Sequence, residues 1–422
     1  MGSEWLYIPL YELCSYLNRG SAPAYAEENG VLVLNQKCVR DQQVSFSEAR
    51  RTDTTKKPIV RERFLKPFDI LVNSTGIGTL GRVAQVRNLS EETTIDSHLT
   101  LVRPDPEAIH PFYLGMAVRC FESKIEALGE GSTGQTELSR SRLGSLLIPV
   151  PSYEEQRAIA HILGTLDDKI ELNRRMNQAL EEMARALFKS WFVDFDPVRA
   201  KAEGRETGLP EEIAALFPDE FEDSELGEIP KGWSVKQLGN IIEISDSKRI
   251  PLSSRERAKR QGPYRYYGAA GIVDYVDDFL FDGVYLLVGE DGTVVTSAGN
   301  PVLQYVWGKF WVNNHAHVIR AKGGVTVEHL FLLLQRINAT PFITGAVQPK
   351  LSQKNMNAIP VIQGPPELNQ IFGRLIDPFF AKVRALNDEK DVLVSIRDAL
   401  LPKLISGEIE VTKAECFTTR HV

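Results

Sequence analysis

Residues 151–195, PSYEEQRAIAHILGTLDDKIELNRRMNQALEEMARALFKSWFVDF, contain the pattern that decides the fold. From Ile159 to Trp191, mostly apolar positions recur at alternating spacings of four and three, the heptad period of a helix with one packed stripe. Residues 365–410 repeat this spacing. We therefore expect two long helices that pack through a shared seam. The expected seam residues are Ile159, Leu163, Leu166, Ile170, Leu180, Leu187, Phe372, Ile376, Phe379, Val383, Leu386, Leu393 and Leu400.

The two helices belong to a larger internal repeat. Sliding the chain by 213 residues places Leu138 on Leu351 and keeps the helices in register, and Trp5 falls on Trp233 at a slide of 228. The matches keep their order, so the changing offset indicates loop insertions in the first copy. Two copies favour mutual pairing of the helices, which can run antiparallel because a whole domain connects them, and Asn173 and Asn177 would help to fix their register. The alternative for either helix alone is packing against the core of its own domain.

Short strands are expected ahead of each long helix. β-Branched and aliphatic runs between turn residues predict strands at 31–34, 69–72, 82–86 and 99–102, then a helix at 111–128. The second copy matches with strands at 284–288, 302–306 and 317–319 and a helix near 327–337. The fold class is therefore mixed α+β. The expected domains are 1–150, a mixed domain; 151–195, a helix; 196–230, an acidic connector; 231–364, a second mixed domain; 365–410, a helix; and 411–422, a tail.

Length and composition limit the class of protein. The chain has 422 residues, of which 43% are hydrophobic and 25% charged, as in a globular protein of two or three domains. No apolar run is long enough to span a membrane, and the N-terminus lacks a signal-peptide pattern. Its four cysteines have no metal-site spacing. We expect a cytoplasmic protein that makes no membrane contact.

The charge is uneven along the chain. The net charge is −7, which at first disfavours nucleic acid as a partner. Residues 151–225, however, carry 9 Lys and Arg against 18 Asp and Glu, whereas residues 226–362 carry 15 against 11. An acidic spacer between near-neutral domains leaves DNA binding open.

The glycine-rich segment 76–81, GIGTLG, matches the dinucleotide-binding pattern GxGxxG, and Asp96 lies at about the expected distance. A cofactor site would need a helix next, but the alternating β-branched run 82–86 follows. The segment therefore favours a hairpin or bulge over a nucleotide-cofactor enzyme.

His315 and His317 share one face of a predicted strand, as two metal ligands would. No third ligand is close in sequence, so a structural histidine pair is the preferred interpretation. GxxxxGK[ST], HExxH and GxSxG are absent. We expect a non-catalytic chain with no metal and no cofactor of its own.

Basic, aromatic and small polar residues gather in loops of both mixed domains. Arg and Lys contact DNA phosphates, and Arg and Gln also bind base edges in the major groove. The alternative is an ordinary solvated loop. The candidate DNA-binding residues are Arg51, Lys56, Lys57, Arg61, Arg63, Asn73, Ser74, Thr75, Gln135, Arg249, Arg255, Arg257, Lys259, Arg260, Tyr264, Arg265 and Tyr266.

Several motifs, in this domain–helix–domain–helix order, resemble those of one family. They are 131–138 (GSTGQTEL), 147–151 (LIPVP), 155–159 (EQRAI), 192–197 (FVDFDP), 227–233 (GEIPKGW) and 351–354 (LSQK). Over about residues 1–412 the chain resembles the DNA-specificity subunit of type I restriction–modification systems. The second copy departs from the family pattern, because Leu368 and Asn369 stand where Glu and Gln are usual.

The resemblance implies two target-recognition domains that each bind one half of a bipartite double-stranded DNA sequence. It implies that the helices separate these domains and dock two methyltransferase subunits, which hold S-adenosylmethionine and methylate adenine. Endonuclease–translocase subunits would join for cleavage. Two rival functions remain, a coiled-coil adaptor without DNA contact and a nucleotide-cofactor enzyme that uses residues 76–81.

Overall fold

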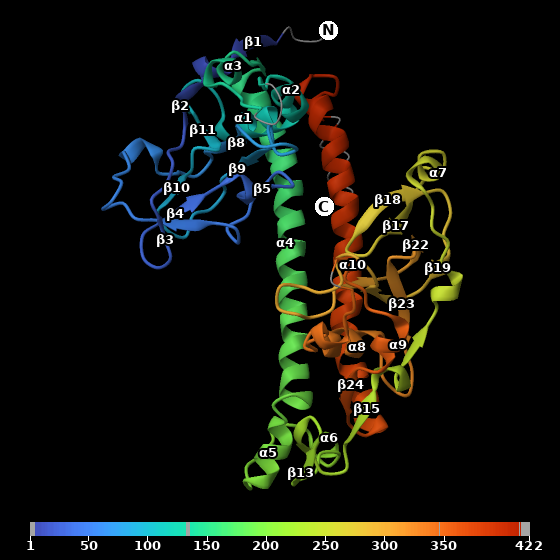
Figure 1. Ribbon diagram of the computed structural model, residues 1–422. Helices are drawn as coiled ribbons and strands as arrows, with labels where there is room; N and C mark the ends of the chain where they lie inside the picture. Colours follow the sequence, from blue (N-terminus) through green and yellow to red (C-terminus); the bar gives the residue numbers. More distant parts are fainter. Residues whose placement is uncertain (1–4, 132–135, 346, 413, 415–422) are drawn as a thin grey trace. The chain divides into compact units, whose positions relative to one another are not determined.

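The computed structural model describes residues 5–131, 136–345, 347–412 and 414. The chain forms two compact units, residues 1–172 with 389–422, and residues 173–388. Each unit contains one strand-rich domain and one half of each long helix, α4 (Tyr153–Phe192) and α10 (Pro366–Ile405) (Figure 1). No helix among the described residues combines the length and apolar character needed to cross a membrane.

The first unit has two four-stranded sheets. One is ordered β2 (Cys14–Arg19), β11 (Leu99–Pro104), β8 (Ile70–Asn73) and β9 (Val83–Gln85), and the other β10 (Thr93–Ile95), β4 (Val31–Leu34), β7 (Arg50–Thr52) and β3 (Tyr25–Ala26). Side chains alternate along β8 because successive strand residues point to opposite faces. Ile70 and Val72 pack with the cluster that includes helix α1 (Pro111–Cys120), while Leu71 packs with residues of the other sheet.

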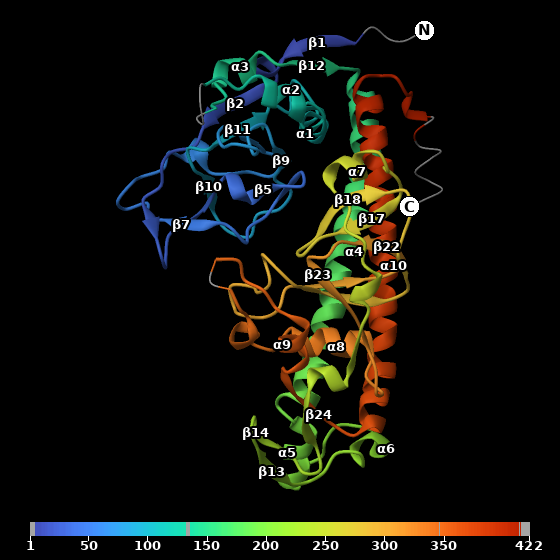
Figure 2. The ribbon, with the colours of Figure 1, turned by 45° about the vertical axis from the view of Figure 1, so that its right-hand side comes forward.

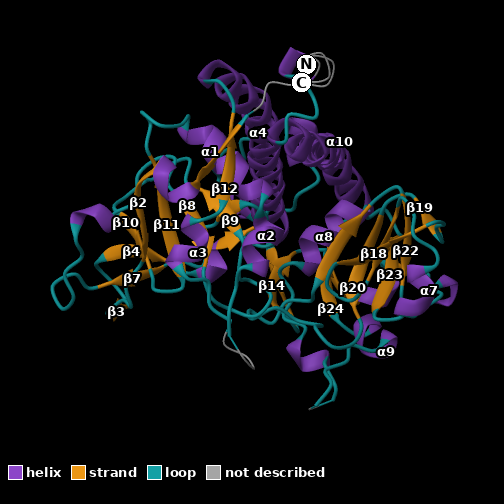
Figure 3. Ribbon diagram, turned by 90° about the horizontal axis from the view of Figure 1, so that it is seen from above, coloured by secondary structure: helices purple, strands orange, loops and turns teal. Residues whose placement is uncertain are grey.

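The second unit repeats this arrangement. One sheet is ordered β16 (Ile242–Ile244), β23 (Ala316–Ala321), β20 (Tyr285–Gly289) and β21 (Leu303–Val306). The other is ordered β18 (Ile272–Val276), β17 (Tyr264–Tyr267), β22 (Lys309–Val312) and β19 (Phe281–Asp282). Figure 3 shows these strands grouped beside α8 (Val327–Leu334). Leu286 and Val288 pack with the α8 cluster and Leu287 with the second sheet, as their counterparts do in β8.

The strand register reproduces the offsets found in the sequence. β1 (Leu6–Pro9) pairs with β12 (Leu147–Val150), which places Leu6 opposite Val150. β15 (Ser234–Gln237) pairs with β24 (Pro360–Gln363), which places Ser234 opposite Gln363. These pairs correspond at slides of 228 and 213 residues, and the sheets β2–β11–β8–β9 and β16–β23–β20–β21 are equivalent as well. The other sheets differ, because the parallel pair lies at the edge in the first unit (β10–β4) and in the middle in the second (β17–β22). The remaining α-helices and strands of the described residues are β5 (Val39–Arg40), β6 (Gln43–Val44), α2 (Glu122–Ala127), α3 (Arg140–Gly144), α5 (Asp196–Ala202), α6 (Glu211–Ala214), β13 (Phe221–Ser224), β14 (Gly227–Pro230), α7 (Ser254–Ala258) and α9 (Gln353–Asn357).

Local chemistry sets the ends of α4. At its start, the Ser152 hydroxyl accepts from the Glu155 N–H while the Glu155 carboxylate accepts from the Ser152 N–H, which forms a capping box. After its end, Phe195 adopts a left-handed conformation with φ of 54°, and Pro197 lies in the first turn of α5. The helix expected at 111–128 is interrupted at Phe121, so it forms α1 and α2 instead of one element.

Within each unit the two long helices run antiparallel, since the first half of one lies along the second half of the other (Figure 2). In each unit, both helices also pack against the strand-rich domain. The helices therefore pair with each other and also pack against a domain core, the two arrangements that the sequence left open. Three expected seam residues, Leu180, Leu187 and Phe379, are only half-buried, and their neighbours Phe188 and Phe380 are buried instead. The buried seam residues are Ile159, Leu163, Leu166, Ile170, Phe372, Ile376, Val383, Leu386, Leu393 and Leu400.

Candidate nucleic-acid interface

The glycine-rich segment 76–81 connects β8 to β9 as an antiparallel hairpin. No helix follows it, so the arrangement contradicts the nucleotide-cofactor alternative, which needs a helix N-terminus to receive the pyrophosphate. Gly81 has φ of 87°, and a Cβ there would lie 2.8 Å from the backbone nitrogen of Glu126. A positive φ and this close approach explain the glycine without a ligand.

Three of the predicted cations in the first domain are exposed: Lys56, Lys57 and Arg61. Arg51 is engaged elsewhere, since it makes two hydrogen bonds of 2.8 and 2.9 Å to the Glu91 carboxylate. This bidentate pair raises the pKa of Arg51, mainly through the side-chain hydrogen bond. Arg63 is half-buried. Of the five cations predicted to bind DNA in the first domain, only these three are therefore exposed.

Asn73 and Ser74 are fully buried at the end of β8, which removes their side chains from the candidate DNA-contacting set. The Ser74 hydroxyl lies 2.5 Å from that of Thr100, and the Asn73 amide donates to the Gln36 carbonyl at 3.1 Å. These bonds hold the Ser74 hydroxyl and the Asn73 amide nitrogen inside the domain. Thr75 is half-buried beside the exposed His98. The predicted residue Gln135 lies outside the described residues.

In the second domain, three predicted arginines form internal ion pairs. Arg249 donates to Glu290 at 2.7 Å, Arg257 to Asp274 at 2.9 Å and Arg260 to Asp277 at 2.9 Å. Arg249 and Arg257 keep only 11% and 13% of their side-chain surface exposed. A charge that is this deeply buried needs its partner, so these two arginines stabilise the fold and leave the candidate DNA-contacting set.

The predicted aromatic residues also lie inside the domain. Tyr266 is buried, with its hydroxyl bonded to the backbone of Leu252, and it leaves the candidate set for this reason. Tyr264 and Arg265 are half-buried. Arg255 and Lys259, in and just after helix α7, remain exposed. They are the predicted cations of this domain that are best placed to meet a phosphate backbone.

A buried polar cluster lies at the start of β23 in the second domain. Nδ1 of His317 lies 2.6 Å from the Asp246 carboxylate, and Nε2 lies 2.7 Å from the Leu351 carbonyl. Burial alone would raise the pKa of Asp246, but hydrogen bonds from His317 and the Val318 N–H hold that pKa below its ordinary value. The bonded partners give His317 a structural role.

The same cluster has the composition of a cation site, because ligand atoms of Asp246, Glu290 and His317 lie within 4.8 Å of one another. Arg249, however, donates to Glu290 and lies 3.3 Å from Asp246. A guanidinium that already neutralises both carboxylates favours an ion-pair cluster over a metal centre. His315 points to a different partner, Asp291, so the two histidines of the HAH segment do not converge.

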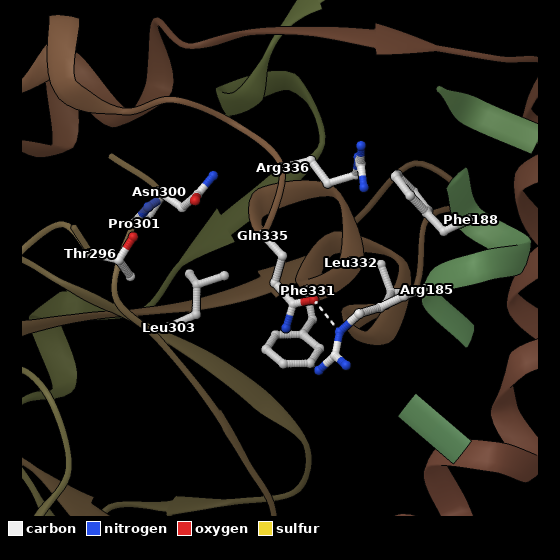
Figure 4. A pocket seen from close by; sticks show the side chains of 10 residues that line it. All are labelled: Arg185, Phe188, Thr296, Asn300, Pro301, Leu303, Phe331, Leu332, Gln335 and Arg336. Atoms are coloured by element: carbon white, nitrogen blue, oxygen red, sulfur yellow. Dashed lines mark hydrogen bonds between the residues drawn. The ribbon is translucent and has the colours of Figure 1, made fainter. Parts of the chain in front are cut away.

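The second unit also has a pocket of about 440 Å³ between α4, α8 and the loop that leads into β21 (Figure 4). Phe188, Phe331 and Leu303 line its apolar part, while Arg185 donates to the Gln335 side chain at 3.1 Å. None of the lining residues belongs to the predicted set. The pocket joins segments more than a hundred residues apart, so no local sequence pattern predicts it.

The departure from the family pattern at residue 369 has a structural counterpart. Buried Gln156 donates to the Pro151 carbonyl at 2.9 Å and accepts from the His110 N–H at 2.8 Å, which links α4 to the start of α1. Asn369 is the corresponding residue of α10, and it donates to the Gly364 carbonyl at 3.3 Å. The shorter amide therefore keeps the bond at the helix start.

Comparison with known proteins gives the family. The family model of the type I restriction modification DNA specificity domain matches residues 50–182 and 230–394, one segment in each copy of the repeat. The type I restriction enzyme HindI specificity subunit of Haemophilus influenzae is 26% identical over 82% of this chain and 88% of its own length. The type I restriction enzyme MjaIX specificity subunit of Methanocaldococcus jannaschii is 30% identical over 87% of this chain and 84% of its own length.

The fold has a counterpart among solved structures. The crystal structure of a type I restriction–modification system S subunit from M. genitalium superposes with a TM-score of 0.59 and covers 95% of this chain and 96% of that one. Their sequences are 19% identical, so this likeness concerns the fold alone. Since the family model and the relatives span most of the chain, this chain belongs to the family of type I restriction–modification DNA specificity proteins.

Proposed function

We propose that the chain is the non-catalytic, DNA-binding specificity subunit of a type I restriction–modification complex. Each strand-rich domain binds one half of a bipartite double-stranded DNA target, and the paired helices set the separation of the two halves. The observation that carries this proposal is the internal repeat. One four-stranded sheet has the same strand order in both copies, β2–β11–β8–β9 and β16–β23–β20–β21, and β1–β12 matches β15–β24 in register. Two related domains on one chain suit a target of two separate parts.

The spacing follows from helix geometry. A helix of 40 residues is about 60 Å long at a rise of about 1.5 Å per residue. One DNA turn is about 34–36 Å, so the centres of the half-sites would lie within about 1.7 turns of each other. In this proposal the helices position the two DNA-binding domains, while a partner subunit catalyses the methylation reaction.

Two methyltransferase subunits dock on the helices in this proposal, and they hold the S-adenosylmethionine used to methylate adenine. Endonuclease–translocase subunits join them for DNA cleavage. Apolar side chains on the outer surfaces of α4 and α10 support protein docking, because an unpartnered helix usually presents polar residues to water. The exposed apolar residues are Leu172, Met176, Met183, Leu375 and Val392.

Single-molecule sequencing of native DNA tests the proposal. Genomic DNA is compared from source cells with this gene intact, deleted and restored on a plasmid. We expect one bipartite methyladenine motif to disappear on deletion and to return on complementation. If every methylated motif of the parent strain persists without the gene, the chain does not direct methylation, and the coiled-coil adaptor becomes the better interpretation.

A further inference from the structure

His98 and His315 hold the same place in the two strand-rich domains. Each ends a turn that leads into the central strand of its sheet. The backbone N–H of His98 donates to the Asp96 side chain at 2.8 Å, and the N–H of His315 donates to the Asn313 side chain at 2.8 Å. The two turns therefore agree in sequence spacing and in hydrogen bonding.

The backbone on the other side of each histidine is fixed in the same way. The carbonyl of His98 accepts from the Ser74 N–H at 2.9 Å, and the carbonyl of His315 accepts from the Glu290 N–H at 2.8 Å. Ser74 and Glu290 directly follow β8 and β20, which are equivalent strands. Both histidines thus lie at the same end of the same sheet.

Both imidazole rings are held through Nδ1, but by different chemical groups. The Thr75 hydroxyl lies 2.7 Å from Nδ1 of His98, and the Asp291 carboxylate bonds Nδ1 of His315. Both rings remain exposed, His315 with 48% of its side-chain surface. Within the described part of the chain, no hydrogen bond involves Nε2 of either ring, which leaves this nitrogen available to a ligand.

The anchors determine what each Nε2 can bind. A carboxylate only accepts hydrogen bonds, so Nδ1 of His315 donates to Asp291, and Nε2 accepts when the ring is neutral. A hydroxyl can donate or accept, so Thr75 leaves both roles open to His98. An imidazole nitrogen can accept from the amino group of adenine or cytosine. As a donor it can bind guanine O6 or N7, or a phosphate oxygen.

Cationic side chains accompany both rings. In the first domain, Arg19 forms an ion pair with Glu137 and donates to the Ser74 carbonyl at 3.1 Å. In the second domain, Lys350 lies 3.2 Å from Glu290 and keeps 48% of its side-chain surface exposed. Each of these cations is paired with a carboxylate, so a contact with DNA at this end of the sheet depends on the imidazole itself.

We propose that His98 and His315 are equivalent DNA-contacting residues, each of which touches its own half of the target through Nε2. Thr75 and Asp291 are positioning residues that hold the rings. This inference rests on the proposed function and deepens it, because it names one pair of contacts that the internal repeat duplicates. Neither histidine belongs to the basic runs in the sequence.

The test uses the specificity subunit assembled with its methyltransferase. H98A and H315A are expressed separately in cells that lack the endogenous gene, and the methylated motif is read by native-DNA sequencing. We expect H98A to relax one half of the motif and H315A to relax the other half. Affinity for the wild-type target falls by about 5- to 10-fold, as for loss of one hydrogen bond.

Paired substitutions at Thr75 and Asp291 distinguish the positioning of the histidine rings from a general effect on packing. T75V and D291A free the rings and should relax the same half-sites as H98A and H315A. T75S and D291N keep an oxygen that bonds Nδ1 and should restore the wild-type motif. H161A, a change at an exposed histidine of α4, is the matched control, and thermal unfolding of each complex verifies the fold.

The outcomes are distinct. A relaxed base position supports a base contact, and a uniform loss of affinity with a weaker salt dependence supports a phosphate contact. The inference is overturned if folded H98A and H315A complexes retain both the full motif and the full affinity. A wild-type complex that methylates no bipartite motif would instead overturn the proposed function, and this inference with it.

Discussion

Arg397 of α10 donates to the carboxylate of Asp167 of α4 at 3.1 Å, an ion pair between residues far apart in the sequence. The second oxygen of this carboxylate accepts from Arg119 of α1 at 3.0 Å. Both arginines are buried. One acidic side chain therefore joins the two long helices to the strand-rich domain of the first unit.

D167N should destabilise the first unit by about 3 kcal/mol, because it leaves two buried guanidinium groups without their shared carboxylate. Arg397 keeps a partner in Asp398, whereas Arg119 keeps no carboxylate among the ion pairs of the described residues. Urea-induced unfolding followed by circular dichroism measures the change.

The neighbouring residue offers a matched control. Asp168 also pairs with an arginine, Arg87, but 71% of its side-chain surface is exposed. D168N should therefore lower the free energy of unfolding by less than about 1 kcal/mol. Equal losses in D167N and D168N would contradict a special role for the buried pair.

His329 should make the second unit sensitive to acid. It is packed against Phe188, Phe192 and Phe372 at ring distances of 5.4, 4.7 and 5.2 Å, and burial lowers its pKa from 6.5 to about 3. Below pH 6.5 the unfolded chain gains a proton that the folded chain does not. Stability therefore falls by about 1.4 kcal/mol per pH unit towards pH 3.

H329F keeps an aromatic ring and removes this titration. The free energy of unfolding, measured by urea from pH 7 to pH 4, should fall less steeply for H329F than for the wild type. H161Q, at an exposed histidine, should follow the wild-type curve. Parallel curves for the wild type and H329F would exclude His329 as the source of the acid sensitivity.

The strands and long helices could be predicted because their signals are local. The aliphatic run at residues 69–72 and the heptad spacing after Ile159 are each recognised from a few neighbours in the sequence, and the repeat supports them at a second place. The hairpin at 76–81 was also predictable, since the residues after it alternate as a strand does. The helix at 111–128 was less so, because its interruption at Phe121 has no proline or glycine to mark it.

The sequence could not predict which of the candidate DNA-binding residues are exposed, because exposure depends on partners that are distant in the sequence. Arg255 and Arg257 lie two residues apart in α7, yet Arg255 is exposed and Arg257 is bound to Asp274 of β18. Likewise, Arg51 meets Glu91 only because the fold brings these residues together. Composition marks a basic loop, while long-range ion pairs decide which cations stay exposed.

The charge double variant R255E/K259E should weaken DNA binding by the assembled complex. Both side chains are exposed, so their reversal leaves the internal ion pairs intact. If each cation meets one phosphate, the slope of log affinity against log salt should become shallower by about 2. Fluorescence anisotropy with a target duplex at several salt concentrations measures this slope.

K236E/K322E changes the net charge by the same amount at two other exposed lysines of the second unit and is the control. We expect it to affect binding less than R255E/K259E. Equal effects would attribute the loss to overall charge, and no effect of either variant would favour an adaptor without DNA contact.

Shortening both long helices should change the distance between the half-sites. Deleting residues 174–180 from α4 and 382–388 from α10 removes seven residues from each helix, which preserves the heptad phase of both. Seven residues correspond to about 10 Å of helix, or about three base pairs of DNA. The methylated motif should therefore keep both half-sites, while its unspecified spacer loses about three base pairs.

Native-DNA sequencing of cells that carry the shortened gene reports the half-sites and the spacer together. A deletion in α4 alone is the control, because it places the two seams out of register and should abolish methylation. If the matched deletion instead alters the bases of a half-site and leaves the spacer unchanged, the helices do not set the separation. The spacing would then have to come from the methyltransferase subunits, since the two strand-rich domains contain the same residues in the shortened and the full-length chain.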